Sequence, residues 1–527
     1  MDFTMTTQLI KPLLISALSA SLLACGGDGS FNGSDDSTSS GWTQGVFAPS
    51  SQFKGQCNAL DEKNWLRSWS NETYLWYDEI TDRDPASIVG VIDYFNTLKT
   101  NATTASGAAK DNFHFSLPTD EYQKMQESGA VMGYGFNFKL LRSAPPREVV
   151  VSYTEPDTPA SAAGVRRGWE IVAVNGVDMI NSNDVDALNS ALFPSTKGVQ
   201  TDFTFKLVGS NEERNITLTT GEFIQDPVMN VSTIATNTGN VGYVQFNDHN
   251  APAERQLYDA FNQLAGSNIS DLVIDMRYNG GGYLAMAAQL GYMVAGAENT
   301  SGLIFEKTIF NDKYPTTNPV TGRPLTPYPF IDEYIAFDPD SGISEGTKLP
   351  SLNLERVFVL SSSNTCSASE ALINGLRGIP AARGFEVILI GGNTCGKPYG
   401  FYPTDNCDTT FFTIQFTGVN HAGFGEYSDG FAPQNTPNAE LAPVYVQGCA
   451  VADDFTHLLG DKNEAMLAAA LSYRTSGVCP APTTAAGLKG YAVQSSASEA
   501  GVSLSDNRWQ TQLKNNRVVT PLPKELN

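Results

Sequence analysis

The chain has 527 residues, too many for a single hydrophobic core, so two to four domains are expected. Its 41% hydrophobic content and 47 glycines are typical of a globular protein with many turns. The formal net charge is −23, from 33 basic and 56 acidic residues, and no basic stripe is present, which argues against nucleic-acid binding.

The first 24 residues are predicted to be an export signal rather than part of the fold. After Lys11 comes an apolar run, PLLISALSASLLA, which is too short and too rich in Ser and Ala for a membrane span. Translation could also start at Met5, which would leave a shorter basic end. The sequence LLAC ending at Cys25 resembles the bacterial lipobox, which implies cleavage before Cys25 and lipidation of its thiol. An ordinary signal peptide with a chance cysteine is the alternative.

Residues 25–55 are rich in Ser, Gly and Asp, a composition typical of a flexible linker. Together with Cys25, this linker predicts an exported, membrane-anchored lipoprotein. Its expected place is the outer membrane or the periplasmic face of a Gram-negative bacterium.

Residues 56–128 are predicted to form a helical N-terminal domain. The apolar positions of NWLRSWSNETYLWYDEI suit an amphipathic helix, and PASIVGVIDYFNTLK has a similar pattern.

Residues 129–222 change to strand patterns. The runs VMGYGFNFKLL, REVVVSYTE, GWEIVAVNG and DFTFKLVG predict four strands, and Asn175-Gly176 predicts a tight turn. Between the second and third runs lies PDTPASAAGVRRG, which can form a short helix. This order resembles a PDZ domain of the circularly arranged bacterial kind. Trp169 is a departure, because that pattern usually has Asp at this position.

The PDZ resemblance implies a peptide-binding loop in the segment GYGF, which consists of Gly133, Tyr134, Gly135 and Phe136. Glycines in such a loop let successive backbone N–H groups converge on a terminal carboxylate while the peptide adds a strand. A small β-domain that binds nothing is the alternative.

Residues 223–480 alternate between strand and helix patterns. Short apolar runs of strand length, NVGYVQF, DLVIDMR, RVFVL and EVILIGG, are separated by the helical stretches APAERQLYDAFNQLAG, YLAMAAQLGYMVAG and SASEALINGLRG. This alternation predicts an α/β core with parallel strands. The segment 305–350 is rich in Pro, Asn, Asp and Gly and is predicted to be a surface insertion. Residues 481–527 form a C-terminal tail without a clear fold signal.

The stretch NTCSASEAL, residues 364–372, lies where a strand passes into a helix. A serine just before the helix places its hydroxyl near the first helical N–H groups, which favour developing negative charge. That geometry suits a nucleophile, Ser367, and it equally suits an inert N-cap.

Two further strand ends favour the nucleophile. The segment RYNGGG, ending at Gly282, has three glycines that let the backbone approach a ligand closely. The segment TCGK, ending at Lys397, places a lone lysine between Gly and Pro, unlike a solvated helical charge.

The motifs SASE, RYNGGG and TCGK, together with a PDZ-like domain, resemble the C-terminal (tail-specific) processing peptidase family of serine proteases over residues 60–475. The resemblance implies a catalytic core of the ClpP/crotonase-like kind. It also implies that Ser367 is the nucleophile, Lys397 the general base, and the backbone N–H groups of Ala368 and Gly282 the oxyanion donors. The segments GKPYGFYP and NHAGFGEYSDGFAP resemble a bacterial lipoprotein branch of this family.

A lysine can take the serine proton only when it is neutral, so burial must lower its pKa towards about 7–8. The family often has a glutamine four residues after the lysine to orient it, but Phe401 stands there, and Asn393 or Thr394 are the candidate substitutes. A Ser–His mechanism, as in tricorn-like proteases, is the alternative, with His249 as the best candidate.

Six cysteines remain beyond Cys25, an even number that favours disulfides in an exported protein and permits fifteen pairings. Contact between the two catalytic residues would bring Cys366 and Cys395 together, so a disulfide bracing the site is expected there. The remaining pairs would then be Cys449 with Cys479 and Cys57 with Cys407.

The predicted protein is an exported, lipid-anchored serine endopeptidase that cleaves protein or peptide substrates near their C-termini with a Ser–Lys dyad and PDZ-assisted recognition. The alternative is a non-catalytic peptide-binding lipoprotein on a degenerate peptidase scaffold. No cofactor is expected, and metal-ligand spacing is absent from the sequence. The sequence does not set the oligomeric state.

Overall fold

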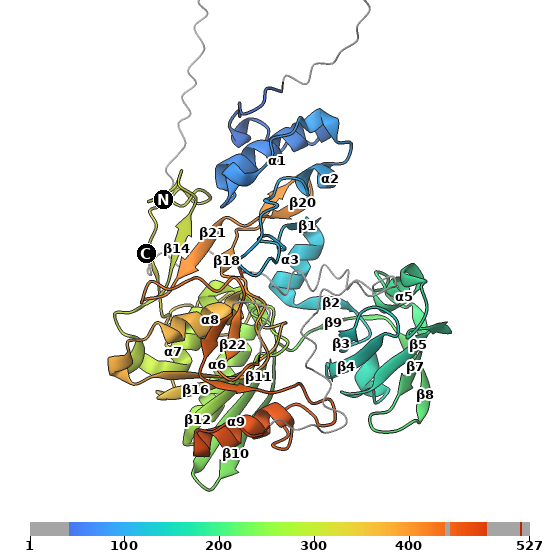
Figure 1. Ribbon diagram of the computed structural model, residues 1–527, viewed down its shortest axis with the longest axis vertical. Coiled ribbons are helices and arrows are strands. Elements are labelled where there is room, and N and C mark those ends of the chain that lie inside the picture. The colour runs from blue at the N-terminus through green and yellow to red at the C-terminus, as the bar shows by residue number, and fades with distance from the viewer. Residues whose placement is uncertain (1–41, 438–442, 482–516, 519–527) are drawn as a thin grey trace, which may run out of the picture. The chain divides into compact units, whose positions relative to one another are not determined.

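The computed structural model describes residues 42–437, 443–481 and 517–518 (Figure 1). The predicted signal peptide, Cys25 and most of the linker lie outside the described residues. The chain divides into two units, Met1–Trp42 and Thr43–Asn527, and every described helix and strand belongs to the second. Among the described helices, none is both long enough and apolar enough to cross a membrane.

The N-terminal part of the second unit is mainly helical. Its elements are η1 (Ser50–Gln52), α1 (Ala59–Thr73), η2 (Tyr77–Glu79), η3 (Pro85–Ser87), α2 (Val91–Phe95), β1 (Phe115–Pro118) and α3 (Thr119–Ser128). Helix α1 begins at Asn58, whose side chain accepts a hydrogen bond from the N–H of Asp61 and so caps the first turn. The stretch PASIVGVIDYFNTLK is helical only in η3 and α2, so the longer helix expected there is wrong.

Strand β1 joins this N-terminal part to a distant segment. It pairs with β20 (Thr409–Phe412), which in turn pairs with β19 (Thr404–Asn406). Trp65 and Trp69 of α1 stack with ring centres 5.1 Å apart, and Phe411 of β20 packs against Trp65. Local patterning does not predict this pairing, because the two strands are almost 300 residues apart.

The next region forms a β-sheet of the predicted kind. Its elements are β2 (Ala130–Gly133), β3 (Phe136–Arg142), β4 (Glu148–Thr154), α4 (Pro159–Ala162), β5 (Glu170–Val174), β6 (Val177–Asp178), α5 (Val185–Leu192), β7 (Gln200–Lys206), β8 (Glu213–Thr219) and β9 (Gly221–Ile224). The strand order is β3-β4-β5-β7-β8, so β3 is an edge strand. The predicted turn is confirmed: Asn175 and Gly176 have φ of 48° and 75° between β5 and β6.

The largest region is built on a six-stranded sheet of order β10-β11-β12-β16-β17-β24. These strands are β10 (Val228–Thr236), β11 (Gly239–Phe246), β12 (Ile269–Asp275), β16 (Arg356–Ser361), β17 (Glu386–Gly391) and β24 (Gly448–Ala450). All neighbours are parallel except β10 and β11. The predicted parallel α/β core is therefore confirmed, and the chain has a multidomain α/β fold.

Helices cover both faces of this sheet (Figure 1). One face packs against α6 (Ala251–Ala265), α7 (Leu284–Thr300) and α8 (Ala368–Arg377), and the other packs against α9 (Ala465–Ser476). Side chains alternate accordingly: Ile274 of β12 lies in the first layer and Val273 in the second. Burial on both faces explains why these strands are almost continuously apolar.

Smaller elements complete the region. They are β13 (Gly282–Tyr283), β14 (Ile304–Phe310), β15 (Tyr328–Pro329), η4 (Ala381–Arg383), β18 (Tyr399–Gly400), β21 (Phe416–Val419), β22 (Phe431–Pro433), β23 (Val444–Val446) and β25 (Arg517–Val518). The segment 305–350 is more than the expected surface insertion: β14 pairs with β21, and Phe305 and Tyr334 are buried in the main core. Turn-forming residues interrupt the apolar pattern of this segment, so the sequence does not show that these side chains are buried.

Candidate active site

Ser367 lies at the junction between β16 and α8, as the N-cap of the helix. Its φ of 60° and ψ of −111° are unusual for a residue with a side chain, and such conformations cluster at functional sites. The residue is fully buried, and within the described residues its Oγ has no hydrogen-bond partner. The Ser367 hydroxyl is therefore a candidate nucleophile at the start of the helix, next to the backbone N–H groups of its first turn.

Lys397 lies in the loop after β17 and is also fully buried. Burial lowers the pKa of its ammonium to about 7, although Asp111 and Glu370 act in the opposite direction. Nζ lies 4.3 Å from the ring centre of Phe401 and 4.8 Å from that of Phe113. Phe401, at the position where the family often has glutamine, is therefore part of the apolar surroundings of this lysine.

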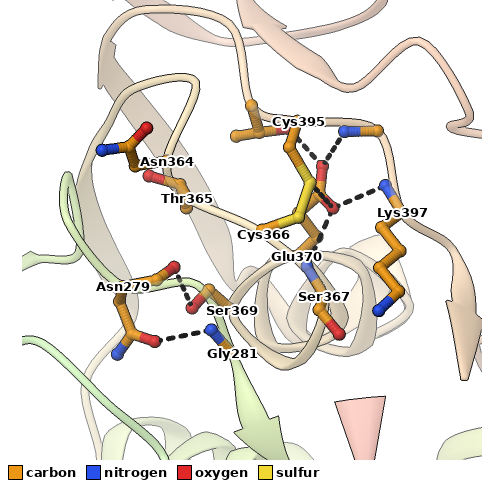
Figure 2. The surroundings of a disulfide bond; sticks show 12 residues. Asn279, Gly281, Asn364, Thr365, Cys366, Ser367, Ser369, Glu370, Cys395 and Lys397 are labelled. Carbon is orange, nitrogen blue, oxygen red and sulfur yellow. Dashed lines mark hydrogen bonds between the residues drawn. A yellow bond between two sulfur atoms is a disulfide. The ribbon is translucent and has the colours of Figure 1, made fainter. Parts of the chain in front are cut away.

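Glu370 joins the serine and lysine segments. Its Oε2 accepts hydrogen bonds from the backbone N–H groups of Ser367 at 3.0 Å and Lys397 at 2.8 Å. Its Oε1 accepts from the Thr394 hydroxyl at 2.5 Å and the N–H of Gly396 at 2.8 Å. One carboxylate therefore holds both segments, and Figure 2 shows the side chains of Ser367 and Lys397 directed into the same space.

This role of Glu370 extends what the sequence indicates. Its position in the first helical turn predicts only a favourable interaction with the helix dipole. Burial raises the pKa of the carboxyl, and four hydrogen-bond donors oppose that change. The spacing of three residues after Ser367 is that of a capping box, which was the available signal.

A disulfide between Cys366 and Cys395 lies beside this carboxylate (Figure 2), at the pair expected from the sequence. It links the residue before Ser367 to the lysine loop. The N–H of Cys395 also donates to the carbonyl of Thr365 at 3.1 Å. The other expected pairs, Cys449–Cys479 and Cys57–Cys407, are formed as well. With both thiols oxidised, Cys366 and Cys395 are not thiolate ligands for a metal ion.

Asn279 organises the glycine-rich loop. Its Oδ1 accepts from the N–H of Gly281 at 2.9 Å, and its Nδ2 donates to the carbonyl of Phe246 at 3.0 Å. Its own carbonyl accepts from the Ser369 hydroxyl and from the N–H of Cys366, each at 3.1 Å. Ser369, in the first turn of α8, therefore braces this loop.

The two expected oxyanion donors, Ala368 and Gly282, lie in the helix start and in the glycine-rich loop. Ala368 is the first residue of α8, so its N–H has no acceptor within the helix. Gly282 has φ of 133°, and a Cβ there would lie 2.5 Å from the carbonyl oxygen of His249. Only glycine fits this close approach, which explains the third glycine of RYNGGG.

His249 packs against the same loop. Its Nδ1 lies 3.0 Å from Oδ1 of Asn279, which can only accept, so Nδ1 carries the proton. Burial lowers the pKa of the imidazole to about 4, so the ring is neutral. Among the described residues no hydrogen bond joins His249 to Ser367, and the structure gives the Ser–His alternative no support.

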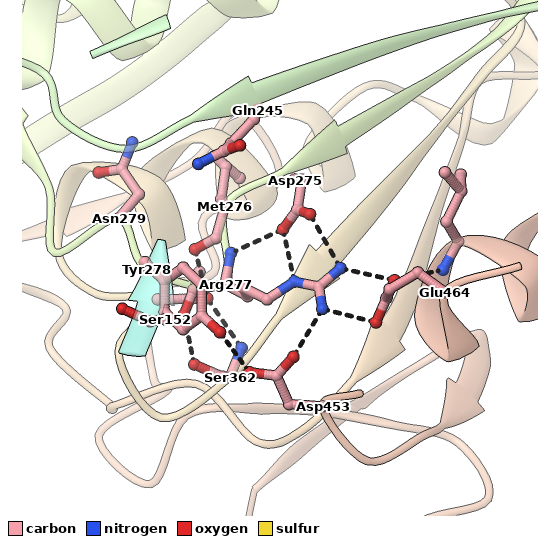
Figure 3. A network of polar contacts seen from close by, with 12 residues as sticks. Ser152, Gln245, Asp275, Met276, Arg277, Tyr278, Asn279, Ser362, Asp453 and Glu464 are labelled. Atoms are coloured by element: carbon pink, nitrogen blue, oxygen red, sulfur yellow. Dashed lines mark hydrogen bonds and ion pairs between the residues drawn. The ribbon is translucent and has the colours of Figure 1, made fainter. Parts of the chain in front are cut away.

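Arg277 of the RYNGGG motif is buried at the centre of an ion-pair network (Figure 3). It binds Asp275 at 2.8 Å, Asp453 at 2.7 Å and Glu464 at 2.8 Å. The next residue, Tyr278, donates its hydroxyl to Asp453 at 2.5 Å. The arginine thus fixes the backbone from which the glycine-rich loop departs.

The PDZ-like region reaches this network through Arg167. Its guanidinium binds Asp453 at 2.5 Å and the Tyr278 hydroxyl at 2.7 Å. Burial alone would raise the pKa of Asp453, but Arg167 and Arg277 hold it well below its usual range. Sequence analysis missed Asp453 and Glu464, which lie in loops without a recognisable motif.

The predicted peptide-binding residues form the turn between β2 and β3. Tyr134 and Phe136 are buried in the core of this region, and the Tyr134 hydroxyl lies 2.7 Å from the Ala191 carbonyl. Gly133 ends β2, and Gly135 has φ of 90°. The two aromatic side chains therefore support the loop, and any contact with a ligand falls to its backbone.

Part of the chain matches a known peptidase family. Residues 240–405 match the model of peptidase family S41. The chain is 26% identical over 211 residues to a carboxyl-terminal-processing protease from Picosynechococcus sp., covering 40% of this chain and 50% of that protein. It is 24% identical over 289 residues to the chloroplastic carboxyl-terminal-processing peptidase 1 from Arabidopsis thaliana, covering 54% and 51%. The chain thus spans about half the length of these curated relatives.

A solved structure from Bacteroides fragilis, provisionally named an S41 protease, shares the fold with a TM-score of 0.57 and 22% identity. The match covers 79% of this chain and 97% of that one. The matched family segment contains Gly282, Ser367 and Lys397, the three positions on which the site is built. Residues 240–405 therefore form a peptidase family S41 domain, and the chain is similar to carboxyl-terminal-processing serine peptidases.

Proposed function

We propose that this protein is a serine endopeptidase that cleaves protein or peptide substrates near their C-termini with a Ser367–Lys397 dyad. The proposal rests on the way Glu370 joins two segments, by accepting hydrogen bonds from the backbone N–H groups of Ser367 and Lys397. Lys397 is buried and has a pKa of about 7, and the Oγ of Ser367 has no hydrogen-bond partner among the described residues. A neutral amine next to a serine is the requirement of this chemistry.

The proposed reaction balances with these groups alone. Nζ of neutral Lys397 takes the proton of Ser367 as Oγ attacks the scissile carbonyl carbon. The N–H groups of Ala368 and Gly282 stabilise the oxyanion. The lysine ammonium then gives its proton to the leaving amine, which leaves an acyl-serine. Water releases the acyl group by the same route, with Lys397 again accepting and returning a proton.

Digestion of denatured casein by wild type, Ser367→Ala and Lys397→Met tests the dyad. The expected result is hydrolysis by wild type and loss of about 10⁴-fold or more in each variant, since nucleophile and base act as a unit. Lys397→Met keeps the side-chain volume in its apolar site and so serves as the less disruptive base variant. Equal residual activity in all three proteins would overturn the dyad. No hydrolysis by wild type of casein or of a peptide library would favour the non-catalytic peptide-binding alternative.

We propose further that the PDZ-like region binds the C-terminus of the substrate. Among the described strands, β3 pairs with β4 alone, so its other edge can pair with an extended peptide next to the turn at Gly133–Phe136. Binding of a fluorescent peptide to the full Ser367→Ala chain checks this. The peptide with a free carboxylate should bind, and its amidated twin should bind at least about 10-fold more weakly. Equal binding of the two peptides would contradict carboxylate recognition.

The exported, lipid-anchored state is also part of the proposal, and it rests on the lipobox-like sequence at Cys25. Radiolabelled palmitate should enter the wild-type protein and not Cys25→Ser, and only the variant should appear in the soluble fraction. Label in both proteins would contradict lipidation of Cys25.

A further inference from the structure

The last described segment of the chain lies beside the proposed catalytic loop. Strand β25, Arg517–Val518, pairs in parallel with β13, with Gly282 opposite Arg517 and Tyr283 opposite Val518. It also contacts β18, Tyr399–Gly400, which begins two residues after Lys397. Arg517 and Val518 therefore contact both the strand that holds the expected oxyanion donor and the strand that follows the expected base.

The tail occupies the side of β13 that carries the Gly282 donor. His249 bonds to the other side of this strand: its N–H donates to the Gly281 carbonyl, and its carbonyl accepts from the Tyr283 N–H, both at 3.0 Å. Backbone groups alternate in direction along a strand, so the N–H and C=O of Gly282 face away from His249. That is the direction in which β25 lies.

The amino-acid sequence of the tail suits this pairing. Val518, Val519 and Thr520 are three consecutive β-branched residues, which favour extended backbone, and Pro521 follows and cannot donate to a ladder. Residues 482–516 connect Ala481 to the strand, and at about 3.3 Å per extended residue they are long enough to reach across a domain of this size.

We propose that the C-terminal tail of this chain binds in cis to the catalytic site as an added strand and competes there with external substrate. The inference rests on the proposed function only in taking the neighbourhood of Ser367 and Gly282 as the substrate site. An extended peptide paired with β13 presents its backbone to the Gly282 donor, as a substrate must. The tail and an external peptide therefore cannot both be bound.

A binding experiment tests the tail without relying on catalysis. The protein is Ser367→Ala, either full length or ending at Asp506, and the probe is a fluorescent peptide of residues 507–527. The truncated protein should bind the probe at least about 10-fold more tightly than the full-length protein, whose own tail fills the site at high effective concentration. A probe carrying Arg517→Pro and Val518→Pro lacks the two strand N–H groups and should not bind. Equal affinity of both proteins, or of both probes, would overturn the proposal.

Steady-state kinetics on the active protein supply the second measurement. With a short reporter peptide, truncation after Asp506 should lower KM about 10-fold and leave kcat unchanged, since a cis competitor affects only free enzyme. The full-length Arg517→Pro/Val518→Pro protein should behave like the truncated one and controls for the change in length. The difference should not depend on enzyme concentration, because a tail acting between molecules would lose its effect on dilution. An unchanged KM, or an effect that disappears on dilution, would contradict binding in cis.

The two proposals fail in different ways. If neither protein hydrolyses any peptide while the truncated protein still binds the probe more tightly, the peptidase assignment fails and the tail assignment stands. If both hydrolyse the reporter with equal KM and neither discriminates between the probes, the peptidase assignment stands and the tail assignment fails. A wild-type protein that is recovered shortened at its C-terminus, when Ser367→Ala is intact, would show that the tail enters the site and would support the inference.

Discussion

At the residue scale, the surroundings of Lys397 decide whether the proposed chemistry operates near neutral pH. The amine accepts a proton only in its neutral form, so activity should follow the deprotonation of the ammonium. Burial among Phe113 and Phe401 lowers the pKa of this group to about 7. For wild type, kcat/KM should rise with pH, with an apparent pKa of about 7, and become constant at higher pH.

Phe401 offers a test of the cause. Phe401→Gln brings a polar amide towards the ammonium and reduces its desolvation, so the pKa of Lys397 should rise and the ascending limb should move to higher pH. Phe401→Leu keeps the wall apolar and should leave the limb near its wild-type position. Reporter-peptide hydrolysis from pH 5 to 10 measures both variants. If the pH profiles of Phe401→Gln and Phe401→Leu had the same ascending limb, the Phe401 ring would not set the pKa of Lys397.

Glu370 is expected to act on rate through the positions of its neighbours. Glu370→Gln replaces one acceptor oxygen with an NH₂ group that faces N–H and O–H donors, so the serine and lysine segments should move apart. We expect kcat to fall about 10²-fold, a loss typical of a small misplacement, with KM nearly unchanged. Glu121→Gln, an exposed residue of α3, is the control and should match wild type. A change confined to KM would assign Glu370 to substrate binding instead.

At the element scale, the buried ion pairs connect residues that follow helices or strands and that no apolar sequence pattern reveals. Arg167 follows α4, Arg277 follows β12, and Asp453 lies between β24 and α9. Removing one member of a buried pair leaves the other charge in an apolar environment, which typically destabilises a protein by about 3–5 kcal/mol. The stabilisation by Asp453 should be complete above about pH 4 and decrease as the pH falls below it, because the pKa of this carboxyl is lowered in the folded state.

Arg167→Met should therefore lower the free energy of unfolding by about 3–5 kcal/mol, measured by denaturant titration at pH 7. Lys348→Met is the control, since Lys348 pairs with Asp332 and Glu333 at the surface and its loss should cost less than about 1 kcal/mol. Equal costs for the two variants would mean that the buried network contributes no more than a surface pair.

At the scale of the whole molecule, the Cys57–Cys407 disulfide closes the longest loop, with a sequence separation of 350. It joins the N-terminal helical region to the turn between β19 and β20. Cross-links restrict the unfolded chain more when the loop is longer, so this bond should stabilise the fold by about 5 kcal/mol, against about 3–4 kcal/mol for the Cys449–Cys479 loop of 30.

The double variant Cys57→Ser/Cys407→Ser should therefore unfold at a lower temperature than Cys449→Ser/Cys479→Ser, by several degrees in thermal scans under oxidising conditions. The two variants remove the same number of thiols and differ mainly in loop length, so each controls for the other. The reverse order of melting temperatures would contradict the loop-length argument.

The amino-acid sequence predicts most strands and helices of the parallel α/β region and points to the two residues of the proposed dyad. The strands β11, β12, β16 and β17 and the helices α6, α7 and α8 follow from apolar periodicity, because each pattern records which face of that element is buried. Ser367 and Lys397 could be found because both lie at strand ends in short segments rich in small residues.

The surroundings of those residues become visible only in the folded chain. Three contacts join segments that are more than 100 residues apart in the sequence. They are the contact of Phe113 with Lys397, the ion pair of Asp453 with Arg277, and the strand pairing of Arg517 with Gly282. Periodicity shows that a side chain is buried but not what it is buried against. The pKa of a lysine and the occupant of a strand edge depend on those partners, so these features become visible only when the distant segments meet in the fold.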